Sequence, residues 1–296
     1  MRGIVAVLTA MALFVLSDTV VKLAGDLMPP TQIMALRGVI AVALMGAIAA
    51  SSVPMARWHL VLQPRVLLRA AIEALVAVLF LASLPHLPLA DITAIQQVTP
   101  LVLTMLSALL LRESVGWRRW SAVVAGFAGV VLVIQPVGQG INIYALSALA
   151  CAVGVAVRDL VTRGLDPAIP TTLVSFTTTL SVCVTGFAGQ PLETWTAPST
   201  YAMTLLAASA VLVSSANLFV ISAFRGTDIS AVAPFRYAGV IWAIILGFLI
   251  WGHIANALAI LGTVILISSG LYIMHREASK MRRAASATEV VPDPHG

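Results

Sequence analysis

The chain places a few charged side chains inside long apolar stretches, where opposite charges could form an ion pair or hold a ligand. Asp18 and Arg37 lie in consecutive stretches, 10 and 9 residues from the turn near Met28. If both stretches are helical, the two side chains lie at similar depth. We expect either a structural ion pair between the two helices or a pair that opens and closes around a ligand. Lys22 follows Asp18 by one helical turn on the same face, and could instead extend to the nearer helix end.

A second polar group is expected in the other half of the chain. Asn217 lies 9 residues before the turn near Gly226 and Arg236 lies 10 residues after it, so both reach a similar depth. Asp159 falls at comparable depth, and we expect Asp159, Asn217 and Arg236 to form a cluster. The planar guanidinium of Arg236 offers five donors that suit a carboxylate or phosphate, and a salt bridge to Asp159 is an equal alternative. Tyr237 could stack on an aromatic or amphipathic ligand.

Two adjacent amides, Gln96 and Gln97, interrupt the apolar stretch 89–111. Two neighbouring amides that both face lipid are costly, so one is expected to face a cavity and the other a neighbouring helix. Pro100 follows in mid-stretch, and Pro234 takes a similar place in the second half. Such prolines kink a helix and can line a cavity or act as a hinge, although ordinary helix curvature is an equal alternative.

Motifs of common enzymes and metal sites are absent from the sequence. The two lysines, Lys22 and Lys280, follow no Gly-rich loop, so there is no Walker A site, and neither HExxH nor GxSxG occurs. His86 and Asp91 fit the H-x4-D spacing of some acyltransferases but lack an accompanying phosphate-binding motif. Five scattered histidines and two cysteines indicate no metal site. We therefore expect no enzyme activity, no metal and no cofactor.

The elements that carry these residues are long and apolar. Hydrophobic residues make up 60% of the 296 residues, charged residues only 10%, and the mean hydropathy is +1.01. A soluble domain usually has about 25% charged residues, so a soluble enzyme, a disordered chain and a nucleic-acid binder are excluded as classes. About 20 apolar residues cross a bilayer as a helix, and the strict alternation of a barrel strand is not seen. Ten such stretches are 3–26, 30–50, 66–84, 89–111, 118–136, 142–163, 170–188, 200–223, 229–250 and 255–275.

The basic residues predict the orientation of these helices. If the N-terminus is cytoplasmic, the outer loops contain no Lys or Arg, and only Lys22 lies near the outer face. This is a positive-inside pattern, and it explains the net charge of +5 without nucleic acid. We expect both termini in the cytoplasm of a multi-pass inner-membrane protein. The residues at the inner loops and tail are Arg57, Arg65, Arg69, Arg112, Arg118, Arg119, Arg163, Arg225, Arg276, Lys280, Arg282 and Arg283.

The two halves of the sequence are similar to each other. Four residues recur at an offset of 141: Asp18, Lys22, Pro29 and Thr31 return as Asp159, Arg163, Pro170 and Thr172. Because each half holds five helices, an odd number, the second half would enter the membrane inverted. We expect an all-α polytopic membrane protein of ten transmembrane helices in two inverted repeats, residues 1–138 and 139–276, with a disordered cytoplasmic tail at 277–296. Chance similarity among Ala-, Leu- and Val-rich helices is the alternative.

One stretch, Leu109–Val133, is the most specific part of a similarity that covers residues 1–276; it reads LLLRESVGWRRWSAVVAGFAGVVLV. The chain resembles the drug/metabolite transporter superfamily, in its EamA branch of ten-helix carriers. The resemblance rests on Glu113 at the end of the fourth helix and on Gly126 and Gly129 in the fifth. The second half departs from this pattern, because an apolar residue stands where a second Glu would be expected.

The resemblance implies a secondary carrier of small organic solutes, with export of metabolites such as amino acids as the first expectation. Uptake of a vitamin or nucleoside-like solute is the nearest alternative, and a channel is an alternative of a different class. Alternating access would place the solute near the midplane of the lipid bilayer. The residues expected to bind it are Arg236, Asn217, Tyr237, Gln96 and Gln97. Those expected to act in gating, or in coupling to protons, are Asp18, Arg37, Lys22 and Asp159. Assembly into homo-oligomers stays open.

Overall fold

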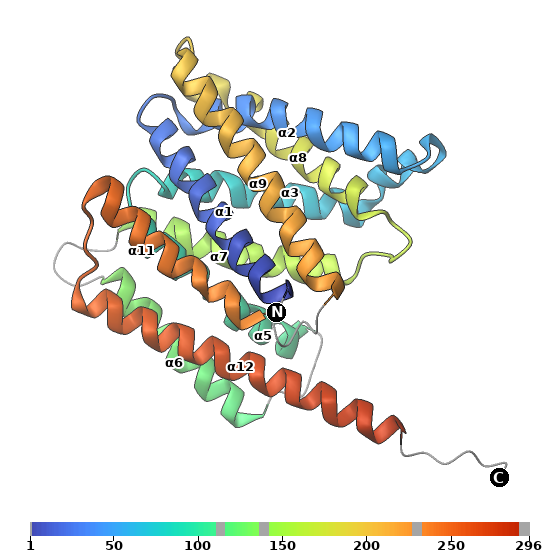
Figure 1. The fold of residues 1–296 in the computed structure, drawn as a ribbon, viewed down its shortest axis with the longest axis vertical. Helices are drawn as coiled ribbons and strands as arrows, with labels where there is room; N and C mark the ends of the chain where they lie inside the picture. The colour runs from blue at the N-terminus through green and yellow to red at the C-terminus, as the bar shows by residue number, and fades with distance from the viewer. Residues whose placement is uncertain (1, 111–115, 136–141, 227–232, 290–296) are drawn as a thin grey trace.

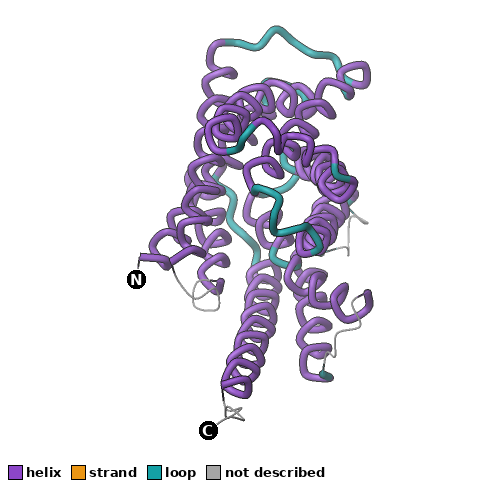
Figure 2. The backbone as a smooth tube through the Cα atoms, turned by 90° about the vertical axis from the view of Figure 1, so that its right-hand side faces the viewer, coloured by secondary structure: helices purple, strands orange, loops and turns teal. Residues whose placement is uncertain are grey.

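The computed structural model describes residues 2–110, 116–135, 142–226 and 233–289. Within these ranges the chain consists of helices joined by turns, and no strand occurs, as the tube in Figure 2 shows. The α-helices are α1 (Arg2–Gly25), α2 (Pro30–Ser52), α3 (Pro64–Ser83), α4 (Leu89–Gln96), α5 (Thr99–Leu110), α6 (Trp117–Ile134), α7 (Ile143–Arg163), α8 (Thr171–Ala188), α9 (Thr200–Gly226), α11 (Ala238–Trp251) and α12 (Ala257–Glu289). Short 3-10 helices are η1 (Met55–Leu62), η2 (Gln190–Leu192) and η3 (Ala233–Tyr237).

The described helices match the expected membrane spans in length and composition. Nine segments are long and apolar enough to cross a bilayer, and α4 and α5 together make one of them, Leu89–Leu110. The apolar segment described in α9, Thr200–Ala216, is shorter than these nine. The protein is therefore an all-helical, multi-pass membrane protein in the part of the chain that the structure describes, and the tenth span stays a prediction.

The last helix is longer than the sequence predicted. We expected a disordered tail at 277–296, but α12 continues as a helix from its apolar part, Ala257–Arg276, to Glu289. The added segment is rich in Ala, Arg, Lys, Glu and Met, which are strong helix formers. A helix already nucleated by the apolar part can extend through such residues at little cost.

Helices of the first 138 residues pack against helices of the rest of the chain. α1 lies against α9, α2 against α8, α3 against α7 and α8, α6 against α12, and α11 against α1 and α4. Figure 1 shows α1 beside α9 and α6 beside α12. The two halves are thus interleaved along the whole bundle, and any opening of the bundle must separate a helix of one half from a helix of the other.

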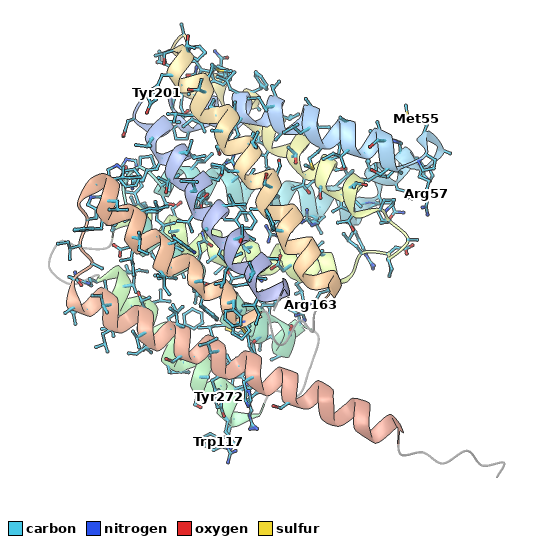
Figure 3. The ribbon with its side chains drawn as sticks, viewed as in Figure 1. Met55, Arg57, Trp117, Arg163, Tyr201 and Tyr272 are labelled. Carbon is cyan, nitrogen blue, oxygen red and sulfur yellow. The ribbon has the colours of Figure 1, made fainter. Side chains whose placement is uncertain are left out.

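The two ends of the bundle differ in charge. One end carries η1, the start of α3 and the end of α7, with Arg57, Arg65 and Arg163, and we call it the arginine-rich end. The turns at the opposite end, 26–29, 84–88, 189–199 and 252–256, contain no Lys or Arg, and we call it the arginine-poor end. Figure 3 shows Arg57 and Arg163 toward one side and Tyr201 at the opposite corner.

The fourth span is interrupted near its middle. The amide N–H groups of Gln97 and Val98 donate to the carbonyls of Ala94 and Ile95, each at 3.0 Å, which are bonds across three residues instead of four. Pro100 follows and has no N–H to donate. The predicted weakening at Pro100 therefore appears as a break between α4 and α5. In the second half, Pro234 lies in η3 ahead of α11, so the helix expected at 229–250 is irregular at its start as well.

Two glycines bring α6 and α12 into backbone contact. A Cβ atom added to Gly262 would lie 2.4 Å from the carbonyl oxygen of Gly129, and one added to Gly129 would lie 2.6 Å from that of Gly262. Small residues of this kind allow membrane helices to pack closely. Only a residue without a side chain fits at either position.

We predict that Gly262→Ala destabilises the protein. Alanine normally favours a helix over glycine by up to about 1 kcal/mol, so a loss would isolate the steric contact. Overpacking typically lowers the free energy of unfolding by about 1–3 kcal/mol. Thermal unfolding of the detergent-purified protein measures it. The matched control is Gly247→Ala in α11, where an added Cβ meets no atom within 4 Å. A Tm of Gly262→Ala at or above that of the parent would contradict the prediction.

Candidate functional site

Asp18 and Arg37 both lie close to Ser17 of α1, but the expected direct ion pair between them is not formed within 4.0 Å. Asp18 follows Ser17 in the chain, and Nη2 of Arg37 on α2 donates to Ser17 Oγ at 3.4 Å. Ser17 is bonded in turn to α9, since its Oγ lies 2.9 Å from Ser209 Oγ and donates to the Ser209 carbonyl at 3.2 Å. We call Asp18 and Arg37 the central pair. It lies where α1 and α2 of the first half meet α9 of the second.

Lys22 is buried and does not extend to the end of its helix. Its Nζ donates to the carbonyl of Leu84 at 2.8 Å and also to that of Leu87, in the turn between α3 and α4. The same ammonium lies 5.4 Å from the ring centre of Trp251, at the end of α11. We call these four residues the Lys22 cluster. It joins α1 and the 84–88 turn of the first half to α11 of the second, at the arginine-poor end.

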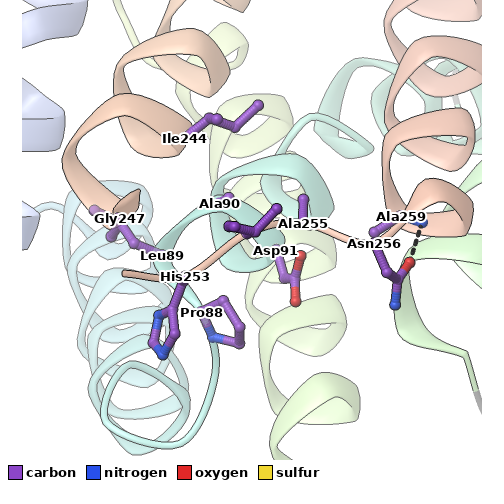
Figure 4. A pocket seen from close by; sticks show the side chains of 11 residues that line it. Pro88, Leu89, Ala90, Asp91, Ile244, Gly247, His253, Ala255, Asn256 and Ala259 are labelled. Atoms are coloured by element: carbon purple, nitrogen blue, oxygen red, sulfur yellow. Dashed lines mark hydrogen bonds between the residues drawn. The ribbon is translucent and has the colours of Figure 1, made fainter. Parts of the chain in front are cut away.

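A small cavity adjoins the Lys22 cluster. It encloses about 190 Å³ between the start of α4, the end of α11 and the 252–256 turn. Its polar lining residues are Asp91, His253 and Asn256, drawn in Figure 4. The carboxylates of Asp26 and then Asp91 are the charges that act on the Lys22 ammonium, and Asp91 also lines the cavity. The cavity lies between the two halves of the chain and is a candidate vestibule at the arginine-poor end.

A salt-bridge cluster joins the two halves nearer the arginine-rich end. Arg158 on α7 donates to Glu73 of α3 at 2.8 Å and to Asp159 at 2.7 Å. Arg69, one turn before Glu73, donates to Thr162 Oγ1 at 2.9 Å and also to Thr178 Oγ1 on α8. We call Arg69, Glu73, Arg158 and Asp159 the Arg158 cluster. It contains two positive and two negative side chains and ties α3 to both α7 and α8.

Asp159 is thus paired with Arg158, and the salt bridge to Arg236, one of the two alternatives for Arg236, is not formed. Arg236 lies in η3 and is exposed, because α11 begins only at Ala238 and the regular helix assumed in placing Arg236 does not exist there. Asn217 lies in α9, but its side chain is outside the described residues. Tyr237 is 6% exposed and packs against Gly270, and its hydroxyl has no hydrogen-bond partner among the described residues. A solute contact by these residues stays a prediction.

One of the two amides of the interrupted span faces a neighbouring helix, and a cavity beside the other stays a prediction. Gln96 donates from Nε2 to Cys151 Sγ of α7 at 3.1 Å, so it faces a neighbouring helix. Gln97 is half-buried and ends α4. Thr99, just after the break, donates to the carbonyls of Gln96 and Ala152, at 2.8 and 3.3 Å. Gln97 is therefore the better candidate of the two for a solute contact.

Several residues of the site were not predicted from sequence. Glu73 and Arg69 are i, i+4 neighbours on α3, yet the salt bridge of Glu73 is formed with Arg158 of α7. Trp251 was not assigned a role, and its contact with Lys22 arises from the fold alone. One available signal was the rarity of charges in these spans, since each such charge needs a partner. In the described residues no group of three or more His, Cys, Asp or Glu side chains is placed to bind a metal.

Comparison with known proteins supports the predicted resemblance. Residues 1–135 match the EamA-like transporter family. The chain is 28% identical over 201 residues to an S-adenosylmethionine uptake transporter of Rickettsia conorii, covering 66% of each chain. It is 29% identical over 230 residues to a riboflavin transporter of Vibrio cholerae, covering 76% of this chain and 74% of that one. A pseudopaline exporter of Pseudomonas aeruginosa is 25% identical over 270 residues, covering 90% and 93%.

The coverage and identity of these matches point to a family and a fold. The chain spans just under two thirds of the Rickettsia transporter. A solved structure superimposes on 94% of this chain and 98% of its own, with a TM-score of 0.60 and 19% identity, which supports the fold alone. Residues 1–135 thus match the EamA-like transporter family, and the described helices are those of a multi-pass membrane protein.

Proposed function

We propose that the protein is a secondary carrier that moves a small organic solute across the inner membrane by alternating access. The single observation that carries this proposal is the arrangement of contacts between the halves. The Lys22 cluster ties them together at the arginine-poor end, and the Arg158 cluster ties them together toward the arginine-rich end. Asp18 of the central pair lies one turn before Lys22 on α1, farther from the arginine-poor end than Lys22. A solute held between two closures that open in turn is what a carrier requires.

The packing of the helices supports the proposed inverted repeat of residues 1–138 and 139–276. If α1 of the first half corresponds to α7 of the second, and α3 to α9, the α1–α9 contact is the counterpart of the α7–α3 contact. The α2–α8 and α6–α12 contacts are each their own counterpart. The separation of arginines between the two ends supports cytoplasmic termini, with the arginine-rich end inside.

Further contacts between the halves support closure at both ends. At the arginine-poor end, the rings of His86 and Tyr144 stack with centres 3.6 Å apart. At the arginine-rich end, Arg65 donates to the Gly164 carbonyl at 2.6 Å and Arg57 to the Ala168 carbonyl at 3.3 Å. We propose that the Lys22 and Arg158 clusters, the latter with Asp159, are the gates, and that Gln97 contributes to the solute site.

Direction and cargo are part of the proposal. Export of amino acids or related metabolites is the first candidate, and the similarity to a pseudopaline exporter supports export. Uptake is the second candidate, because relatives named for S-adenosylmethionine uptake and riboflavin transport cover 66% and 76% of the chain. Proteoliposomes preloaded with unlabelled amino acids, S-adenosylmethionine or riboflavin test both. Saturable counterflow of the labelled solute is expected for a carrier, and flux without saturation or exchange would support a channel.

Coupling to protons is tested in the same vesicles. Asp18 and Asp159 are the carboxylates expected to couple transport to protons, and we expect only an aspartate free of an ion pair to do so. Asp159 is held by Arg158 at 2.7 Å, so Asp18 is the better candidate. We predict that an imposed pH gradient accelerates transport severalfold and that Asp18→Asn abolishes this acceleration. If transport by the parent protein is indifferent to the gradient, the carrier is not proton-coupled.

A further inference from the structure

A groove on the surface of the bundle runs between α6 and α12. It has a volume of about 600 Å³, and Trp117 of α6 and Tyr272 of α12, labelled close together in Figure 3, both line it and are exposed. The opposite ends of these helices meet at the arginine-poor end, where the side chains of Gln135 and Asn256 exchange hydrogen bonds of 2.7 and 3.0 Å. The groove therefore lies at the arginine-rich end, where α6 begins and the apolar part of α12 ends.

Small residues leave this groove hollow. Its α6 side includes Ser121, Ala122 and Ala125, and its α12 side includes Ser268 and Ser269. Alanine and serine are too short to fill the space between two helices, so an open volume remains between them. Ser121, Ala125 and Ser268 are exposed. A molecule can therefore enter the groove without any opening of the bundle.

Ser269 is a buried serine whose hydroxyl has no partner. The residue is 7% exposed, and its side chain forms no hydrogen bond with any residue that the structure describes. Thr263 on the same helix shows the usual arrangement within a membrane span, because its hydroxyl donates to the Ala259 carbonyl at 2.8 Å. A polar group that is buried without a hydrogen bond is unfavourable. The Ser269 hydroxyl, on the wall of an open groove, is therefore suited to a ligand that accepts a hydrogen bond.

Arg118 gives the groove its positive charge. It lines the groove together with Trp117, whose ring centre lies 5.6 Å from the guanidinium, and the described lining contains no carboxylate. Trp and Tyr side chains concentrate where a membrane meets water, so Trp117 and Tyr272 place this part of the groove at the level of the lipid headgroups. Ser269 lies two helical turns before Arg276, the last residue of the span, and hence farther into the membrane. The groove thus offers a cation at headgroup level and a hydroxyl farther in.

We propose that this groove binds an anionic phospholipid, whose phosphate lies at Arg118 and whose ester carbonyls accept hydrogen bonds from Ser268 and Ser269. A guanidinium suits a phosphate, and basic pockets between membrane helices bind acidic headgroups. The acyl chains would continue along exposed apolar side chains of α6, such as Val124 and Val131. A second copy of the chain fits less well, because a two-fold interface at this groove would bring two Arg118 side chains together. The site depends on neither the cargo nor the direction of transport.

Native mass spectrometry of the detergent-purified protein measures which lipid stays bound. Dioleoylphosphatidylglycerol and dioleoylphosphatidylcholine share their acyl chains, but the first is anionic and the second has no net charge. We expect phosphatidylglycerol to be retained at concentrations about fivefold lower, which is the effect of one arginine near a membrane surface. Inorganic phosphate at the same concentration is expected not to displace it, because phosphate lacks the esters and the chains. Equal retention of both lipids, or displacement by inorganic phosphate, would overturn the proposal.

Variants assign this preference to the groove. Arg118→Gln is expected to remove the preference for phosphatidylglycerol, whereas Arg163→Gln, which removes an exposed arginine outside the groove at the same end, keeps it. Ala125→Leu leaves the charge in place but fills the groove, and we expect it to weaken retention of phosphatidylglycerol severalfold. An unchanged preference in Arg118→Gln, or unchanged retention in Ala125→Leu, would contradict the proposal. So would a dimer of the parent protein that Ala125→Leu dissociates, because the groove would then hold a second copy.

Ser269→Ala separates a lipid contact from a structural role. In lipid-free detergent the variant loses no hydrogen bond to a described residue, so its Tm is expected to equal or exceed that of the parent. The rise in Tm caused by phosphatidylglycerol is expected to be smaller in the variant, because a ligand stabilises the folded state more when it binds more tightly. A lower Tm without lipid, or the same rise in both proteins, would overturn the proposed contact at Ser269.

Discussion

Arg158→Gln is expected to open the arginine-rich end and to expose Cys151 to a membrane-impermeant maleimide from that side. Arg158 is the cation between Glu73 and Asp159, and without it two carboxylates are left facing each other across the α3–α7 contact. Breaking a fully buried pair costs about 3–5 kcal/mol. Because Arg158 and Glu73 are 21% and 22% exposed, we expect about 1–3 kcal/mol, a shift of roughly 5- to 150-fold in the balance of states.

Cys151 is a natural reporter for this opening. It is 1% exposed, lies two turns before Arg158 on α7, and contacts the Val76 carbonyl of α3 and the Gln96 amide of α4. The chain has one other cysteine, Cys183, which Cys183→Ala removes. In this background, vesicles of both orientations are labelled. We expect faster labelling in Arg158→Gln only from the arginine-rich face.

The matched control for Arg158→Gln is Arg163→Gln, which removes an exposed arginine from the same helix. We expect the labelling rate of Cys151 in this variant to equal that of the parent. If Cys151 stays unreactive in Arg158→Gln while the protein remains folded, the Arg158 cluster does not close this end. If Cys151 is labelled equally fast in both variants, the faster labelling results from the lower positive charge at the arginine-rich end and not from loss of the Arg158 cluster.

The spans and the charged ends could be predicted because they depend on local properties of the chain. An apolar run of about 20 residues needs no tertiary information to be recognised, and the arginines mark the loops directly. The similar depth of Asp18 and Arg37 was also predictable, because both positions are counted from the same short turn, although the direct ion pair between them is not formed. Where two residues lie on consecutive, regular helices, sequence distance gives their depth.

The same counting failed where a helix is irregular or a partner is distant. Arg236 was placed as if its helix ran from residue 229, whereas the regular helix α11 begins at Ala238, and Arg236 is exposed. The pairing of Glu73 with Arg158 depends on the packing of α3 against α7, which the sequence does not state. For Lys22, the alternative that it extends to the helix end is wrong, because two backbone carbonyls and the ring of Trp251 hold it inside.

Lys22→Met is expected to open the arginine-poor end and to slow transport at least about tenfold. A hydrogen bond from a charged donor contributes about 1.5–3 kcal/mol, and a cation–π contact about 0.5–2 kcal/mol. Methionine keeps an apolar stem of similar length but loses the bonds to the Leu84 and Leu87 carbonyls and the contact with Trp251. It also leaves Asp91 without the cation that acts on it.

The Cys151 reporter distinguishes this opening from the one caused by Arg158→Gln. With Cys183 replaced by alanine, we expect Lys22→Met to speed labelling from the arginine-poor face, the opposite side. Arg163→Met is the control, because Arg163 follows Lys22 at the offset of 141 residues but is exposed. Trp251→Leu is expected to act in the same direction. The double variant is expected to label little faster than Lys22→Met alone, because both substitutions remove the same contact between Lys22 and Trp251. Fully additive effects would mean that Lys22 and Trp251 act separately. Labelling from the same face in Lys22→Met and Arg158→Gln would show that the two clusters do not close opposite ends.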